Sequence, residues 1–162
     1  MPKLRSTLFT VALIFLPIEM CAADELQLGF ELGIQLDDAR NYASANGWSL
    51  RPMSADLPNE WVVDGTDGSL FICENRVLAV RRNFEGTLDI FASMVVNATG
   101  TRGLPETTIV TFMVGNVRIS NIDARYDAED GSGLLIQLNS TDGNIGILTN
   151  VWSAEDCSEP RE

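Results

Sequence analysis

The chain has no histidine, and its single lysine, Lys3, lies near the N-terminus. Without histidine it lacks the base of a histidine-dependent triad and a common metal ligand, and without further lysines it lacks the usual P-loop or Schiff-base amine. It also contains no G-x-S-x-G and no G-x-G-x-x-G sequence. Serine hydrolases, zinc enzymes and nucleotide kinases are therefore disfavoured. We predict a protein without enzymatic activity, cofactor or metal.

Long apolar runs are absent too, apart from residues 8–18, which are too few to span a bilayer, for which about 20 residues are needed. Lys3 and Arg5 precede this run and Cys21-Ala22-Ala23 follows it, which is the pattern of a secretory signal peptide. We therefore predict that residues 1–23 are removed, that Asp24 becomes the N-terminus and that the protein is periplasmic or secreted.

Cys21 raises the alternative of a lipoprotein, in which a cysteine at the end of the signal carries a lipid. The three residues before it, Ile18-Glu19-Met20, are not the small residues that a lipobox requires. We therefore expect no membrane anchor after cleavage.

Cysteine is scarce in the mature chain, where only Cys73 and Cys157 remain. Disulfides persist in the compartments that signal peptides lead to, so we predict a bond between these two residues. The alternative, a reactive or metal-binding thiol pair, would need a nearby histidine or further cysteine, and the sequence offers neither.

Positively charged residues are scarce as well. After removal of residues 1–23, nine arginines and 22 acidic residues remain, for a net charge of −13. Nucleic acids and anionic membranes require clustered lysine or arginine, so neither is expected as a partner. The negative charge serves solubility or, alternatively, steers the protein toward a basic partner.

Two segments have helical periodicity. Residues 36–46 have acidic residues in their first turn and end before Gly47. A second apolar stripe begins after the N-cap Thr87 and ends before Gly100. Residues 24–35 alternate and predict a short strand or extended segment. Further strands are predicted at residues 48–53, 60–64, 69–73, 76–82, 107–114, 117–126, 134–139 and 145–152.

This order predicts an α+β fold with two short helices packed on antiparallel meander sheet or sheets. Because a helix followed by a meander occurs twice, we expect two similar α+β modules, residues 24–84 and residues 85–162. The joint near residues 82–86 is too short for a flexible tether, so the modules should share a sheet or pack directly.

Carboxylates are the one remaining source of acid and base chemistry. A glycosidase needs two of them across a cleft, and four are candidates by type: Asp64, Asp67, Asp123 and Asp127. Asp64, Asp67 and Asp127 lie in glycine-rich turns, where aspartate ordinarily serves turn hydrogen bonding. Residues 127–131 and 139–144 resemble calcium loops but lack EF-hand ligand spacing.

Aromatic and arginine side chains are the candidates for binding a partner. Trp48 and Trp152 are expected in the core, which a small domain fills with large aromatics. Trp61 lies beside an acidic turn, and Arg81 and Arg82 end a strand. We predict that Trp61, Arg81 and Arg82 contact the partner. The alternative is an ordinary solvated strand end.

Residues 33–39, a short helix, a tryptophan-bearing strand and then residues 70–77 together resemble the helix-plus-meander unit of bacterial envelope proteins. Examples are the small outer-membrane-assembly lipoproteins and the secreted β-lactamase-inhibitor protein. The resemblance covers residues 33–82, with a looser match from Thr87 onward, but the lipobox of the lipoproteins is missing. It implies a non-catalytic domain that binds another protein through its sheet face and loops.

The expected function is therefore an exported binding module for another envelope or secreted protein, as inhibitor, immunity factor or assembly accessory. A carboxylate-dependent glycan hydrolase is the alternative. A third possibility, a ligand carrier, would require an apolar pocket of several hundred Å³.

Overall fold

A computed structural model describes residues 26–155 and residue 157. The predicted signal peptide, its cleavage site and the mature N-terminus lie outside these residues. The described part contains two helices, α2 (Leu36–Ala45) and α3 (Leu88–Arg102), each followed by four strands. The strands after α2 are β1 (Ser49–Ser54), β2 (Leu57–Asp64), β3 (Gly68–Cys73) and β4 (Arg76–Glu85). Those after α3 are β5 (Glu106–Val114), β6 (Val117–Asp127), β7 (Gly133–Thr141) and β8 (Asn144–Trp152).

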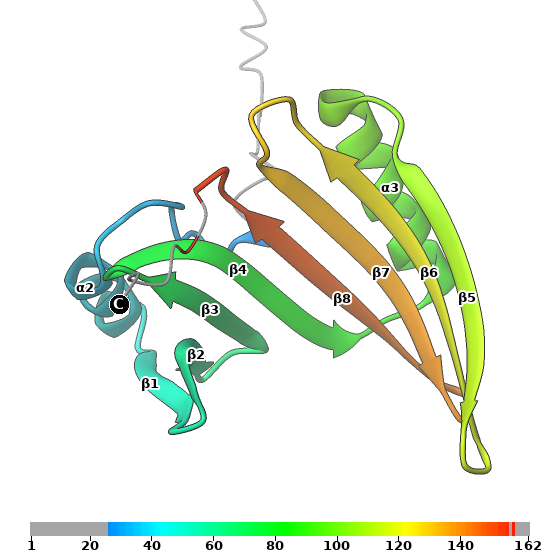
Figure 1. The fold of residues 1–162 in the computed structure, drawn as a ribbon, viewed down its shortest axis with the longest axis horizontal. Helices are drawn as coiled ribbons and strands as arrows, with labels where there is room; N and C mark the ends of the chain where they lie inside the picture. Colours follow the sequence, from blue (N-terminus) through cyan, green and yellow to red (C-terminus); the bar gives the residue numbers. More distant parts are fainter. Residues whose placement is uncertain (1–25, 156, 158–162) are drawn as a thin grey trace, which may run out of the picture.

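All eight strands form one antiparallel sheet in the order β1-β2-β3-β4-β8-β7-β6-β5 (Figure 1). Each group of four is a meander of neighbouring hairpins. The last strands of the two meanders, β4 and β8, pair with each other. Their pairing begins with Ala79 opposite Trp152 and ends with Glu85 opposite Gly146. The expected α+β fold is thereby confirmed, with a single sheet.

Both helices cover the same face of this sheet. Val80, Val151 and Leu134 are neighbours on β4, β8 and β7, so their side chains share one face, and all three are buried. Val80 belongs to the apolar cluster under α2, and the other two belong to the cluster under α3. Among the described residues, no helix lies on the opposite face.

Local signals account for the ends of the helices. Asp37 and Asp38 occupy the first turn of α2, where the helix dipole favours acidic groups. Thr87 caps α3, because its Oγ1 accepts a hydrogen bond from the Ile90 N–H. Helix α3 continues past Gly100, where the sequence predicted its end, and stops at Gly103, whose φ of 83° breaks the helix.

The prediction of an extended segment at residues 24–35 was wrong for the described residues. The backbone turns instead, with the Phe30 N–H donating to the Gln27 carbonyl. Leu28, Gly29 and Gly33 have φ values of 53°, 75° and 86°. These left-handed conformations interrupt a strand, and only a single bridge, between Gln35 and Arg76, remains.

The predicted disulfide is confirmed: Cys73 at the end of β3 is bonded to Cys157, across a sequence separation of 84 residues. Their Cα atoms are 5.7 Å apart, a usual distance for a disulfide. The bond ties the C-terminal segment to the first meander.

We expect the Cys73→Ala/Cys157→Ala double variant to lose about 2–4 kcal/mol of unfolding free energy, because the long loop is then unconstrained in the unfolded chain. Urea denaturation of the mature protein measures this loss. Reduction of the wild type should move the midpoint by the same amount. An unchanged midpoint in both experiments would contradict the prediction.

Thr149 on β8 is fully buried, and its hydroxyl has no hydrogen-bond partner among the described residues. A buried unpaired hydroxyl is destabilising, and valine has nearly the same shape. We therefore expect Thr149→Val to stabilise the protein by about 1 kcal/mol and to raise its melting temperature by about 2–4 °C. Thr149→Ala, which also removes a packed methyl group, should lower it. A lower melting temperature for the valine variant would contradict this account.

Candidate functional site

The three predicted partner-binding residues do not lie on one face. Trp61 is paired with Leu70, and Leu70 with Val80, so its side chain points to the helix-covered face. Arg81 follows Val80 and points to the opposite face, while Arg82 returns to the helix-covered face. The structure therefore separates Arg81 from Trp61 and Arg82.

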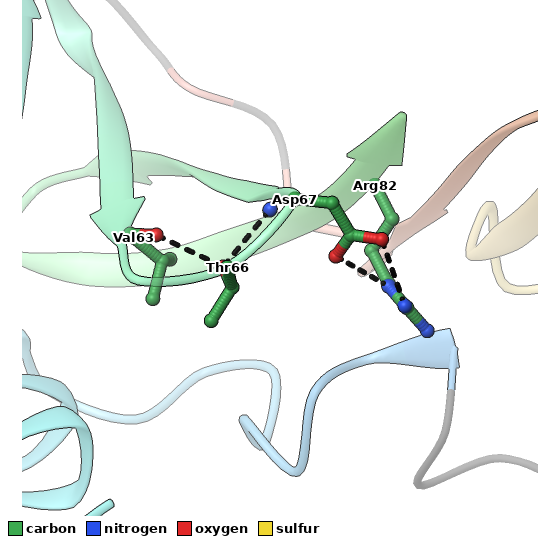
Figure 2. A network of polar contacts seen from close by, with 5 residues as sticks. Val63, Thr66, Asp67 and Arg82 are labelled. Carbon is green, nitrogen blue, oxygen red and sulfur yellow. Dashed lines mark hydrogen bonds and ion pairs between the residues drawn. The ribbon is translucent and has the colours of Figure 1, made fainter. Parts of the chain in front are cut away.

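Arg82 holds the turn between β2 and β3. Its Nε and Nη2 donate to Asp67 Oδ1 and Oδ2 at 3.0 and 2.9 Å (Figure 2), and its side chain is 19% exposed. Its guanidinium carbon also lies 5.0 Å from the centre of the Phe84 ring. Within the turn, the Thr66 hydroxyl donates to the Val63 carbonyl and accepts from the Gly68 N–H. These contacts give Arg82 a structural role.

Trp61 belongs to the margin of the core. It packs, half-buried, against the apolar cluster under α2. The guanidinium carbon of Arg40, on α2, lies 5.1 Å from the centre of its ring. The indole therefore joins α2 to β2.

The face opposite the helices, which we call the open face, is marked by a row of residues across the sheet. Each residue in this row is paired with the next, one from every strand: Arg51, Val62, Ser69, Arg81, Asn150, Leu135, Arg125 and Glu106. No helix among the described residues covers this face, and Figure 1 shows α3 behind β6 and β7.

Arg81 lies near the middle of the open face, between Ser69 on β3 and Asn150 on β8. It is exposed, and within the described residues it has no carboxylate partner. The Oδ1 atoms of Asn150 and Asn121, on the same face, accept no hydrogen bond from the described residues. Both Oδ1 atoms are buried, whereas Arg81 is exposed on this face.

An aromatic site on β8 and β6 extends this surface. The guanidinium carbon of Arg125 lies 4.9 Å from the centre of the Trp152 ring, and the Trp152 Nε1 donates to the Gly131 carbonyl at 3.0 Å. The indole lies against Gly133 on β7, where any Cβ would collide with the ring. The expectation that Trp152 is a core residue was therefore wrong, because it packs on the open face over a glycine.

Beside Trp152, the open face is hollowed. This hollow of about 460 Å³ is bounded by Phe71 and Ala79 of the first meander, the turn at Gly131 and the C-terminal segment that ends at Cys157. The disulfide holds that segment against β3, so it fixes one wall of the hollow.

The four candidate carboxylates all have partners. Asp64 accepts from Arg51 at 2.8 Å and Asp127 from Arg125 at 2.8 Å, in addition to the Asp67–Arg82 pair. Asp123 accepts from the Gln137 amide at 2.8 Å. The hydrogen bond from Arg125 lowers the pKa of Asp127, whereas a general acid needs a raised pKa. No cluster of three or more potential metal ligands occurs among residues 26–155 and 157.

On the other side of the sheet, a cavity of about 540 Å³ lies between α3, β4 and the start of the described chain. Its lining is mainly apolar and includes Phe84, Ile90 and Met94. Among the described residues, the charged members of the lining are Arg82 and Arg102, and none is aspartate or glutamate. The cavity has the size of a small-molecule site.

The chain matches no protein-family model, no curated protein and no solved structure. In the part that the structure describes, neither helix has the length and apolarity of a membrane span.

The sequence singled out Arg81 as a candidate for binding, but it did not single out Arg125 or Trp152, which the structure places on the same face. A signal was present, because on β6 the polar residues Asn121, Asp123 and Arg125 alternate with less polar ones, as expected for a strand with one solvated face. These residues lie on the same sheet face as Arg81 because β4 pairs with β8, and the sequence did not predict that pairing.

Proposed function

We propose that the protein is an exported, non-catalytic binding module that engages another envelope or secreted protein through the open face. It would act as an inhibitor, an immunity factor or an assembly accessory. The observation that carries the proposal is Arg81, an exposed arginine without a carboxylate partner in the described residues, near the centre of an uncovered sheet face.

The composition of the open face supports this role. Arginine and tryptophan are the usual energetic anchors of protein interfaces, and Arg81, Arg125 and Trp152 provide both types. Their strands belong to one hydrogen-bonded sheet, so the backbone positions from which these side chains extend are fixed before binding. Arg125 is further fixed by Asp127 and Trp152.

Export to the periplasm or the outside of the cell is part of the proposal. The Cys73–Cys157 bond supports it, because disulfides are rare in reducing compartments. The resemblance to helix-plus-meander envelope proteins agrees with such a location, and membership of that group is part of the same proposal.

We also infer that residues 24–84 and 85–162 are two similar modules. The same order of one helix and four strands on each side of the joint supports this inference. So do the two apolar clusters, since buried residues from Phe30 to Val80 form one and those from Phe91 to Val151 form the other.

The alternative of a glycan hydrolase has less support. Three of the four candidates are paired with arginine, and for Asp127 the hydrogen bond from Arg125 lowers the pKa, the opposite of what a general acid needs. They stabilise turns and strand ends, which agrees with a binding protein.

To test the binding surface, the mature chain serves as bait in an envelope extract, and the affinity of the captured protein is then measured. We expect Arg81→Ala and Arg125→Ala each to weaken binding at least about tenfold, since losing an interface anchor costs about 1.4 kcal/mol or more. Because Arg81 is exposed, Arg81→Ala should leave the melting temperature nearly unchanged.

Arg102→Ala is the matched control. It removes the same charge from the helix side of the protein, so binding should stay within about twofold of wild type. Equal losses for Arg81→Ala and Arg102→Ala would mean that only net charge matters. Wild-type affinity for both open-face variants would place the binding surface elsewhere.

A second candidate function is carriage of an amphiphilic anion in the cavity beside α3. The apolar lining suits a hydrocarbon chain, and Arg102 suits an acidic head group in an otherwise acidic protein. This candidate concerns a different surface from the open face.

We expect the mature protein to bind a fluorescent long-chain fatty acid, and Met94→Trp to abolish binding by filling the cavity. Val96→Trp, on the exposed side of the same helix, should bind like wild type. An uncharged alcohol of the same chain length tests the role of Arg102. No binding of the fatty acid by the wild type would exclude this candidate.

A further inference from the structure

Strand β5 is an uncovered edge of the sheet. Among the described strands it pairs with β6 on one side only, and all nine of its residues are exposed. Ile109, Val110, Phe112, Met113 and Val114 are exposed apolar side chains on this edge. No charged residue and no proline follows Glu106 within the strand. Long apolar edges of this kind are templates for pairing with another strand.

The other edge of the sheet differs in every respect that matters for pairing. Strand β1 has only six residues, and it contains Arg51 and Pro52. Its pairing with β2 also shifts register between Pro52 and Ser54. Charge, proline and irregularity are the features by which proteins protect a sheet edge from association. The chain therefore protects one edge of its sheet and leaves β5 unprotected.

The backbone of β5 can pair with an identical strand. The β5–β6 hairpin closes on Val114 and Val117 through the two-residue turn Gly115-Asn116, so Val114 and every second residue before it direct their N–H and C=O groups to β6. The backbone groups of the residues between them point outward. These residues are Thr107, Ile109, Thr111 and Met113.

The side chains of β5 are also complementary to those of a second copy. In an antiparallel pair centred on Thr111, Ile109 of one copy lies opposite Met113 of the other. In the same register, Val110 lies opposite Phe112. Ile109 and Met113 are on the helix side of the strand, and Val110 and Phe112 are on the open-face side, so apolar pairs form on both faces. In this register, the outward N–H and C=O groups of one copy lie opposite those of the other.

We propose that β5 is a dimerisation edge at which two copies of the chain pair antiparallel about a two-fold axis through Thr111. Two eight-stranded sheets then become one continuous sheet. The symmetric register favours a second copy over a foreign strand, because Ile109, Val110, Phe112 and Met113 each meet an apolar residue of the same strand, and only Val114 meets a threonine, Thr108. The dimer also joins the two open faces side by side.

The first test is the mass of the mature protein in solution, measured by sedimentation over a range of concentrations. We expect a concentration-dependent dimer, and a monomer for Ile109→Lys, because two lysines then enter an apolar edge. Val96→Lys is the matched control, since Val96 on α3 is 70% exposed and Ile109 is 71% exposed. It makes the same change of charge and should remain dimeric.

The second test fixes the register. Opposed residues in a hydrogen-bonded antiparallel pair have Cα atoms about 5.5 Å apart, which permits a disulfide. Thr111→Cys should therefore form a covalent dimer on mild oxidation. Thr107→Cys should not, because its counterpart lies at the far end of the paired strand.

Three outcomes would overturn the proposal. The first is a monomeric wild type at every concentration, and the second is equal crosslinking of the Thr111→Cys and Thr107→Cys variants. Protection of β5 amides from hydrogen exchange only after a different protein is added would assign the edge to that protein's strand, and would equally exclude self-pairing.

Discussion

The pairing of β4 with β8 is the interaction on which the rest of the structure depends. Each meander by itself would leave one of these long strands as an open edge. Pairing them removes both edges and brings the two apolar clusters onto one face, where Val80 and Val151 are direct neighbours. The same pairing places Arg81 beside Asn150 and so makes the open face continuous across the two halves.

The elements themselves were predictable from local signals. Turn residues such as Gly115-Asn116 and Asp142-Gly143 separate strands whose apolar and polar residues alternate, and Thr87 marks the start of α3. The segment before α2 was not predictable, because its alternation resembles a strand while left-handed residues such as Gly29 bend it. The alternation of apolar and polar residues along a sequence does not reveal the backbone φ angles.

The faces of single side chains were harder to predict, because register decides them. Trp61, which the sequence singled out as a partner contact, packs at the margin of the core, and Trp152, expected in the core, packs on the open face. The pairing register is also irregular between Pro52 and Ser54 and between Phe71 and Ile72. Trp152 packs where it does because Gly133 lies opposite it on another strand. Arg81 and Arg82 differ in role for the same reason: neighbours along a strand face opposite sides of the sheet.

The position of β8 has a consequence for the order of assembly. The last strand of the chain lies in the middle of the sheet, between β4 and β7, so the second half of the sheet cannot attach to the first until residues near Trp152 are available. A chain that emerges from its N-terminus can form the first meander early, with β4 still lacking a neighbour. Completion of the fold is therefore a late event that joins residues distant in sequence, a contact pattern that slows folding. Strand β4 lacks its neighbour β8 until residues near Trp152 have emerged.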